Sequence, residues 1–172
     1  FVFLSTGLVR RGSAVPRGRI VLGLSFPWER IAAELEQDPD FLFRFVAMPR
    51  AFEEFVAGAY VQSGWSDVTL TKQTRDGGID VIVSADVPGV GRIVVANEVK
   101  AYSPGRIVGV KDVSRVVAAI GANPGFSKAV VTTTSRFSAD VSKEFGQLMP
   151  GRLELKDGAA LRAWIAKLRS KR

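Results

Sequence analysis

Apolar side chains recur at helical spacing in the first part of the chain. Trp28, Ile31 and Leu35 form the first stripe, in a short helix that the Asp38-Pro39 pair ends. The dense apolar segment over 41–46 comes next and is also predicted to be helical.

The clearest amphipathic helix carries apolar residues at i, i+3, i+4, i+7 and i+8 from Phe52. Gly64 ends it. A rotation of about 100° per residue places Glu54 opposite the apolar stripe and Glu53 on its shoulder. Glu54 is therefore expected to face water, whereas Glu53 can reach the edge of a core.

After this helix the pattern changes to alternation and to short β-branched runs. Strands are predicted over 68–72, 79–83 and 93–102. The second and third are joined by a Pro- and Gly-containing loop over 85–91, whose hairpin length predicts antiparallel pairing.

Helices and strands alternate in the rest of the chain. A helix is predicted over 110–120, a buried strand over 129–134 and a helix that Ser138 caps. A short edge strand over 152–155 and a last helix opened by Asp157 follow. A strand–helix–strand step after a meander implies a parallel crossover. The predicted fold is α/β, a mixed β-sheet of an antiparallel meander plus a parallel crossover strand, flanked by helices.

The composition restricts the chemistry further. The 172 residues include no cysteine and no histidine. Thiol nucleophiles, zinc ribbons, Ser-His-Asp triads and histidine-based nuclease sites are therefore excluded for this chain. Any catalysis must use carboxylates, lysine, hydroxyls and an oxygen-ligated metal such as magnesium or manganese.

The net charge of +7 lies at the two ends of the chain. Residues 1–27 carry four arginines and no acid, and residues 152–172 carry seven basic and two acidic residues. Basic ends favour a polyanionic partner such as DNA, and they equally fit a role in solubility alone. The chain is divided into a basic N-terminal arm over 1–27 and a folded domain over 28–172.

The N-terminal arm shows no targeting signal. Its apolar run over 1–9 precedes the arginines instead of following them, and its apolar stretches are far shorter than a membrane span. Residues 7–13 resemble the protease site of an expression linker, so part of the arm is interpreted as engineered sequence. A cytoplasmic setting without membrane contact is the simplest expectation.

Three charged residues are predicted to converge at the hairpin formed by the strands over 79–83 and 93–102. Asp80 follows two glycines at the start of one strand, and Glu98 and Lys100 lie two apart on the next, so their side chains share a face. Antiparallel pairing brings Asp80 close to both. An acid and a lysine on a buried strand are costly unless they are paired or bound to a metal.

This arrangement has a chemical use. Two carboxylates and the backbone carbonyl of Val99 suit the oxygen coordination of Mg²⁺ or Mn²⁺. The ion polarises a scissile phosphate, and Lys100 orients or deprotonates the attacking water. The alternative is a buried ion-pair cluster without activity. A second Glu-x-Lys triplet, Glu154-Leu155-Lys156, lacks the preceding Gly-Gly-x-Asp hairpin, so only the first has a catalytic context.

Five short motifs occur in a fixed order along the chain. They are Phe52-Glu53, Gly64-Trp65, Asp76-Gly77-Gly78-Ile79-Asp80, Glu98-Val99-Lys100, and Val130-Val131-Thr132-Thr133 before Phe137-Ser138. Together they resemble the Mrr-type restriction endonuclease domain of the PD-(D/E)xK nuclease superfamily, over about 50–161. The resemblance implies a metal-dependent DNA endonuclease acting in restriction or defence against foreign DNA. It implies that Asp80 and Glu98 bind the metal, that Lys100 assists the water and that Glu53 completes the metal shell.

Two departures from the family pattern bear on the substrate. Mrr-type domains often carry glutamine where this chain has Glu98, and Ile79 replaces the nominal proline. Glu98 moves the chain toward the wider superfamily, which includes the archaeal Holliday-junction resolvases, whereas the position of Ile79 is loose in that superfamily. A structure-specific nuclease for branched or repair DNA is therefore one alternative. A non-catalytic, nuclease-fold DNA-binding module is another.

Contacts with DNA and with other subunits are expected as well. Lys111 and Arg115 lie one turn apart on the outer side of a predicted helix. With Arg106 they can follow a DNA backbone, or they form an ordinary solvated face. The need to cut two strands predicts a homodimer. The absence of a helix-turn-helix pattern over 1–50 predicts a separate recognition domain in a larger complex.

Overall fold

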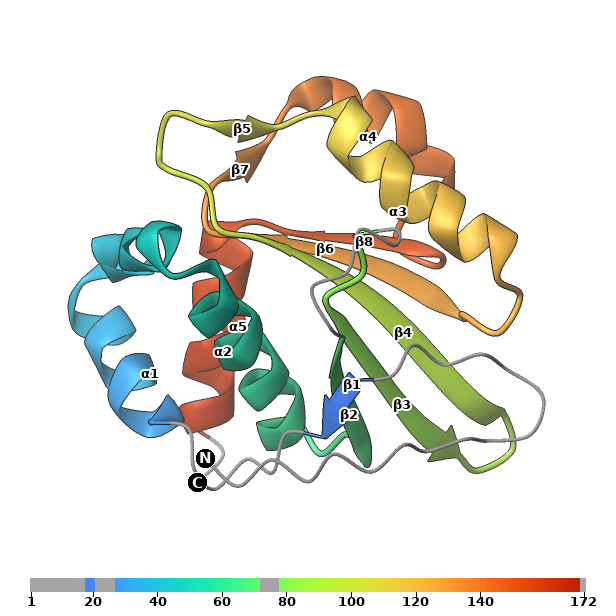
Figure 1. Cartoon of the computed structure of the whole chain (residues 1–172), viewed down its shortest axis with the longest axis horizontal. Helices are drawn as coiled ribbons and strands as arrows, with labels where there is room; N and C mark the ends of the chain where they lie inside the picture. The colour runs from blue at the N-terminus through green and yellow to red at the C-terminus, as the bar shows by residue number, and fades with distance from the viewer. Residues whose placement is uncertain (1–17, 21–26, 72–77, 171–172) are drawn as a thin grey trace.

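A six-stranded mixed sheet, with helices on both faces, forms the centre of the part of the chain that the structure describes (Figure 1). The computed structural model describes residues 18–20, 27–71 and 78–170. The strands are β1 (Gly18–Ile20), β2 (Asp67–Thr71), β3 (Val81–Val87), β4 (Gly91–Lys100), β5 (Ile107–Val108), β6 (Lys128–Thr133), β7 (Arg136–Phe137) and β8 (Leu153–Lys156). The helices are α1 (Trp28–Gln37), α2 (Pro49–Gln62), α3 (Val110–Ala122), α4 (Ala139–Phe145) and α5 (Gly158–Arg169), with 3-10 helices η1 (Pro39–Ala47) and η2 (Gly146–Leu148). None of the described helices is long and apolar enough to cross a bilayer.

The order of strands in the sheet is β1-β2-β3-β4-β6-β8. β1 to β4 pair antiparallel, whereas β4 with β6 and β6 with β8 pair parallel. The predicted mixed sheet, with an antiparallel meander and a parallel crossover, is confirmed. The carboxyl ends of β4, β6 and β8 therefore lie at one edge of the sheet.

Two apolar layers hold the sheet between its helices. On one face α1, α2 and α5 pack around fully buried side chains such as Phe52 and Leu161. On the other face α3 and α4 pack around Val113, Val116 and Val141 (Figure 1). The apolar stripes that predict these helices in the sequence are thus the surfaces that they bury.

The differences from the predicted elements are local. The segment predicted as helical over 41–46 is part of a 3-10 helix, η1. Ser138 stands at the N-cap of α4 without a side-chain capping bond, whereas the Asp157 carboxylate accepts the N–H of Ala160 at 2.8 Å as α5 begins. The strands β1, β5 and β7 were not predicted, because two or three residues are too few to show an alternating pattern. β1 falls within the segment assigned to the basic arm, and its backbone pairs with β2.

The basic C-terminal segment belongs to the folded core. It contains β8 and α5, and Leu161 and Ile165 of α5 are buried. Arg169 pairs with Glu36 of α1, and Lys156 pairs with Glu154 on β8. Part of the positive charge of this segment is therefore neutralised inside the fold, and deletion of the segment would remove a strand and a core helix.

Gly158→Ala is expected to destabilise the protein by about 1–3 kcal/mol. A Cβ at Gly158 would lie 2.5 Å from the backbone carbonyl oxygen of Thr134, so α5 would have to shift away from β6. Urea denaturation followed by circular dichroism measures the change. The control is Gly105→Ala, where a Cβ meets nothing within 4 Å. Equal stability of the two variants would contradict the close packing of α5 on β6.

Candidate active site

The pairing of β3 with β4 brings Asp80, Glu98 and Lys100 together. Val81 pairs with Asn97, so Asp80, one residue before β3, stands opposite Glu98. The backbone N–H of Asp80 donates to the carbonyl of Asn97 at 3.0 Å, which continues the ladder. Glu98 and Lys100 lie two residues apart on β4 and share a face of the sheet. The three residues that the sequence singled out are therefore neighbours in space.

Glu98 and Lys100 form a largely buried ion pair. The Lys100 Nζ lies 2.6 Å from Glu98 Oε1, and the two side chains are only 11% and 6% exposed. The second carboxylate oxygen, Glu98 Oε2, is buried and has no hydrogen-bond partner among the described residues. A buried carboxylate oxygen without a partner is costly, so this atom marks a place that fits a cation or an ordered water.

Asp80 lies where its negative charge is disfavoured. Burial raises the pKa of Asp80 to about 7. The Val99 N–H, which donates to Asp80 Oδ2 at 2.7 Å, acts to lower this pKa but does not outweigh burial. The nearby carboxylates of Glu53 and Glu98 add to the upward shift of this pKa. Burial also raises the pKa of Glu98, although its ion pair with Lys100 opposes the shift. A cation bound between Asp80 and Glu98 would stabilise both in their ionised forms.

Lys100 is held in its protonated form. Burial acts to lower the pKa of Lys100, but the bond to Glu98 and the nearby Tyr102 and Asp112 raise it overall. The Asp112 Oδ1 lies 3.9 Å from Lys100 Nζ, and the Tyr102 hydroxyl donates to the same oxygen at 3.4 Å. The Tyr102 ring centre lies 5.7 Å from Nζ. These groups place the ammonium at the carboxyl end of β4.

The predicted DNA contacts are exposed, and two of them lie beside this group. The Arg106 guanidinium stacks over Tyr102, with 3.8 Å between its central carbon and the ring centre. Arg115 of α3 acts electrostatically on Glu98. Lys111 is exposed in the first turn of α3. A role in DNA binding stays a prediction for all three.

The sequence includes Thr133 in a family motif but does not show that Thr133, Thr134 and Asp112 contact the segment around Lys100. The Thr133 hydroxyl donates to the Lys100 carbonyl at 2.9 Å, and the Thr134 N–H donates to it at 3.2 Å. Thr134 Oγ1 also accepts the N–H of Tyr102 at 2.8 Å. β-branched residues are expected on any buried strand, and an acid such as Asp112 is common in the first turn of a helix. Neither the two threonines nor Asp112 therefore stands out in the sequence as a contact of Lys100.

Glu53 is buried more deeply than its position on the helix shoulder predicts. It is 6% exposed, and its carboxylate pairs with Arg50, which also donates to the Thr71 carbonyl at 3.1 Å. Within the described residues, no three acidic side chains stand close enough to enclose a metal ion by themselves. Glu53 as a metal ligand stays a prediction.

The residues present fit a hard divalent cation. Asp80 and Glu98 supply carboxylate oxygens, one of them without a partner in residues 27–71 and 78–170, and Mg²⁺ commonly completes its shell with carbonyl oxygens and water. Gly78 keeps the space beside Glu98 open, because a Cβ there would lie 3.0 Å from Glu98 Oε1. Asp76 and Gly77 of the same motif lie outside the described residues.

Gly78→Ala is expected to lower any activity of this site about tenfold, because the added methyl group displaces the Glu98 carboxylate. Gly78 has a φ of +71°, so the substitution also costs about 1 kcal/mol of stability. Gly89→Ala is the matched control, since Gly89 has a φ of +77° and open space around its Cβ position. Single-turnover cleavage and thermal unfolding measure the two effects. Equal activity of the two variants would contradict the role of the open space.

The second Glu-x-Lys triplet has a different environment. Glu154 and Lys156 lie on the opposite face of the sheet, where Val130, the partner of Glu154, faces the α2 and α5 layer. Burial acts to raise the pKa of Glu154, but ion pairs with Lys128 and Lys156 lower it overall. Both oxygens of this carboxylate are therefore paired with cations of the protein, whereas among the described residues Glu98 is paired through Oε1 alone.

Comparison with known proteins agrees with this geometry. Residues 47–165 match the family model Mrr_cat, described as Restriction endonuclease. No curated protein sequence matches the chain.

Three restriction endonucleases of known structure share the fold. The DNA modification-dependent restriction endonuclease AspBHI is 22% identical, with a TM-score of 0.55 over 84% of this chain and 40% of its own. MspJI restriction endonuclease, in complex with a 27-mer oligonucleotide, is 23% identical, with a TM-score of 0.55, and the match covers 89% of this chain and 34% of the MspJI chain. Restriction endonuclease FokI is 14% identical, with a TM-score of 0.55, and the match covers 84% of this chain and 31% of the FokI chain. This chain thus spans less than half the length of each.

Proposed function

Because the chain belongs to the Mrr_cat family of restriction endonucleases, we propose that its Asp80, Glu98 and Lys100 site hydrolyses DNA phosphodiester bonds with a divalent metal ion. The observation that carries the proposal is the buried Oε2 of Glu98, which has no hydrogen-bond partner in the described part of the chain. A purely structural ion pair would satisfy this oxygen, as the cations around Glu154 do on the other face of the sheet.

Asp80 and Glu98 are the proposed metal ligands, together with the backbone carbonyl of Val99. When bound, Mg²⁺ or Mn²⁺ would polarise the scissile phosphate and acidify water. The raised pKa values of the two carboxylates fit this role, because burial disfavours their ionised forms in the free protein and a bound cation would stabilise those forms.

Lys100 acts as a cation at the reacting phosphate. Its pKa is raised, so the ammonium form predominates at neutral pH. A protonated lysine donates hydrogen bonds to the attacking water or to a phosphate oxygen and offsets the charge that develops there. Of the two roles expected from sequence, orienting the water is therefore favoured over removing its proton.

The biological substrate is proposed to be foreign DNA. AspBHI is a modification-dependent restriction endonuclease, and sharing its fold makes a restriction role for this chain the simplest proposal. Recognition would then reside in a separate domain or partner, and a second copy of the site would cut the second strand. Arg106, Lys111 and Arg115 are proposed to contact the DNA backbone beside the site.

Plasmid cleavage tests the proposal. Supercoiled plasmid incubated with the protein and Mg²⁺ or Mn²⁺ is expected to give nicked and linear products, and EDTA is expected to prevent them. A branched four-way junction included in parallel tests the structure-specific alternative. Binding of DNA without cleavage of either substrate, with either metal, would show that the enzyme proposal is wrong and would leave a DNA-binding module.

A further inference from the structure

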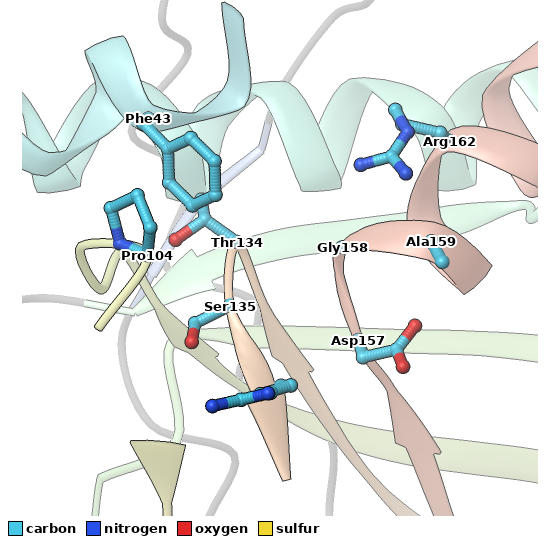
Figure 2. Close-up of a pocket in the computed structure, with 9 residues that line it drawn as sticks. Phe43, Pro104, Thr134, Ser135, Asp157, Gly158, Ala159 and Arg162 are labelled. Carbon is cyan, nitrogen blue, oxygen red and sulfur yellow. The ribbon is translucent and has the colours of Figure 1, made fainter. Parts of the chain in front are cut away.

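A pocket of about 350 Å³ opens at the carboxyl ends of β6 and β8, outside the group formed by Asp80, Glu98 and Lys100. Its walls come from η1, from the chain after β4, from the end of β6 and from the start of α5. In Figure 2 Phe43 and Pro104 lie at one side, Arg162 lies at the other, and Thr134 lies between them.

Two arginines give the pocket a positive charge. Arg136 and Arg162 both line it, and neither forms an ion pair with a described residue. The one acid in the lining, Asp157, already accepts the N–H of Ala160 at the start of α5. The arginines are therefore available for an anionic group such as a phosphate.

The opposite wall offers an aromatic surface. Phe43 of η1 is half-buried, and its ring stands beside Pro104 in Figure 2. An aromatic ring facing cations is the combination on which proteins hold unpaired nucleotides, because the base stacks on the ring while the backbone meets the positive charge. The volume exceeds what a phosphate alone would fill and lies within the range of small-ligand pockets.

The pocket adjoins the strand that carries Lys100. Thr134, in the pocket wall, donates its N–H to the Lys100 carbonyl and accepts the N–H of Tyr102. Ser135, also in the wall, donates its hydroxyl to the Arg106 carbonyl. Through these bonds the pocket wall is joined to the backbone of β4 at and after Lys100, so the pocket lies at the same carboxyl edge of the sheet as Lys100.

We propose that this pocket holds one unpaired nucleotide of the DNA strand that is cut, with its base against Phe43 and its phosphate between Arg136 and Arg162. The proposal rests on the proposed function for the identity of the ligand as DNA. It goes beyond that function in naming the preferred substrate, which is a duplex with a single-stranded or opened segment next to the cleavage position.

Fluorescence anisotropy in EDTA, where cleavage is prevented, tests the proposal with two labelled DNAs. One is a blunt hairpin duplex, and the other is the same duplex with a single-stranded thymidine tail. The wild-type protein is expected to bind the tailed DNA about tenfold more tightly. Phe43→Ala is expected to abolish this preference without changing the affinity for blunt DNA, and Phe43→Tyr, which keeps an aromatic ring, is expected to retain it.

The proposed contact of Arg162 with a phosphate is tested by the salt dependence of binding to tailed DNA. Arg162→Ala is expected to reduce the slope of log affinity against log salt concentration by about 0.7, the value for one phosphate contact on a single strand. Arg30→Ala removes an exposed arginine of α1 that does not line the pocket, and it is expected to leave the tail preference unchanged. Circular dichroism verifies that each variant is folded.

Two results would overturn the inference. One is equal wild-type affinity for tailed and blunt DNA, and the other is a Phe43→Ala variant that keeps the tail preference. Failure of the proposed function has a different signature. A protein that prefers tailed DNA through Phe43 but cuts no DNA with Mg²⁺ or Mn²⁺ would retain the pocket assignment and lose the enzymatic one.

Discussion

Lys100→Ala is expected to reduce the rate of plasmid nicking in Mg²⁺ by about 100-fold or more. The ammonium lies 2.6 Å from Glu98 and is held at the carboxyl end of β4 by contacts from β6 and α3. Its removal takes away the cation that we propose orients water and offsets charge at the phosphate. DNA affinity measured in EDTA is expected to change little, because one lysine among many basic groups contributes modestly to binding.

Lys156→Ala is the matched control. Lys156 occupies the same place in the second Glu-x-Lys triplet and is similarly buried, with 13% of its side chain exposed, but it lies on the other face of the sheet. The Lys156→Ala variant is expected to nick plasmid at close to the wild-type rate. A Lys100→Ala variant that cuts as fast as the wild type would remove Lys100 from the mechanism. Equal losses in both variants would indicate a general loss of structure.

Asp80→Asn is expected to abolish cleavage and at the same time to stabilise the metal-free protein by on the order of 2 kcal/mol at pH 8. Burial raises the pKa of Asp80 to about 7, so the wild-type protein at pH 8 bears the cost of a buried carboxylate charge. Asparagine removes that charge, and its carbonyl oxygen can still accept the N–H of Val99.

The pH dependence of this stabilisation has a definite sign. The unfolded chain ionises Asp80 near its ordinary pKa of about 3.9, whereas the folded protein keeps it protonated up to about pH 7. Between these values the folded state binds the extra proton, so the stability of the wild type falls as the pH rises. The advantage of Asp80→Asn should therefore be largest at pH 8 and should shrink toward pH 5.

Urea denaturation of both proteins at pH 5 and pH 8, in EDTA and in Mg²⁺, measures these effects. Mg²⁺ is expected to stabilise the wild type and to leave Asp80→Asn unchanged, because binding to the folded state alone adds to stability. Asp86→Asn is the control on the same strand, where the side chain is 74% exposed. An Asp80→Asn protein that is less stable than the wild type at pH 8 would contradict an unfavourable buried charge at this position.

Local patterns in the sequence predict most of the fold and bring together the residues of the proposed site. The meander could be predicted because β3 and β4 are joined by a short turn, so their residues pair with neighbours that are close in the chain. The same hairpin places Asp80 opposite Glu98. The parallel crossover could be predicted because a helix separates two apolar strands, and such a connection has few topological solutions.

The supports of the site depend on contacts between distant segments. Thr133 and Thr134 reach Lys100 only because β6 pairs parallel to β4, and Asp112 reaches it from α3. Nothing in the local sequence distinguishes these residues from ordinary strand and cap residues. The pocket likewise draws on η1, α5 and the segments that follow β4, β6 and β8, which meet only when the sheet is complete.

The sequence by itself narrowed the possible chemistry, since a chain without histidine or cysteine is limited to carboxylates, lysine, hydroxyls and an oxygen-ligated metal. Its local periodicity also determined the hairpin that joins Asp80 to Glu98. Only the tertiary structure decided which of the two Glu-x-Lys patterns has a buried carboxylate oxygen with no partner among the described residues. The reason is that burial and charge at a side chain are set by whatever packs against its face of the sheet, and at Glu98 and Glu154 those neighbours come from elements far away in the chain.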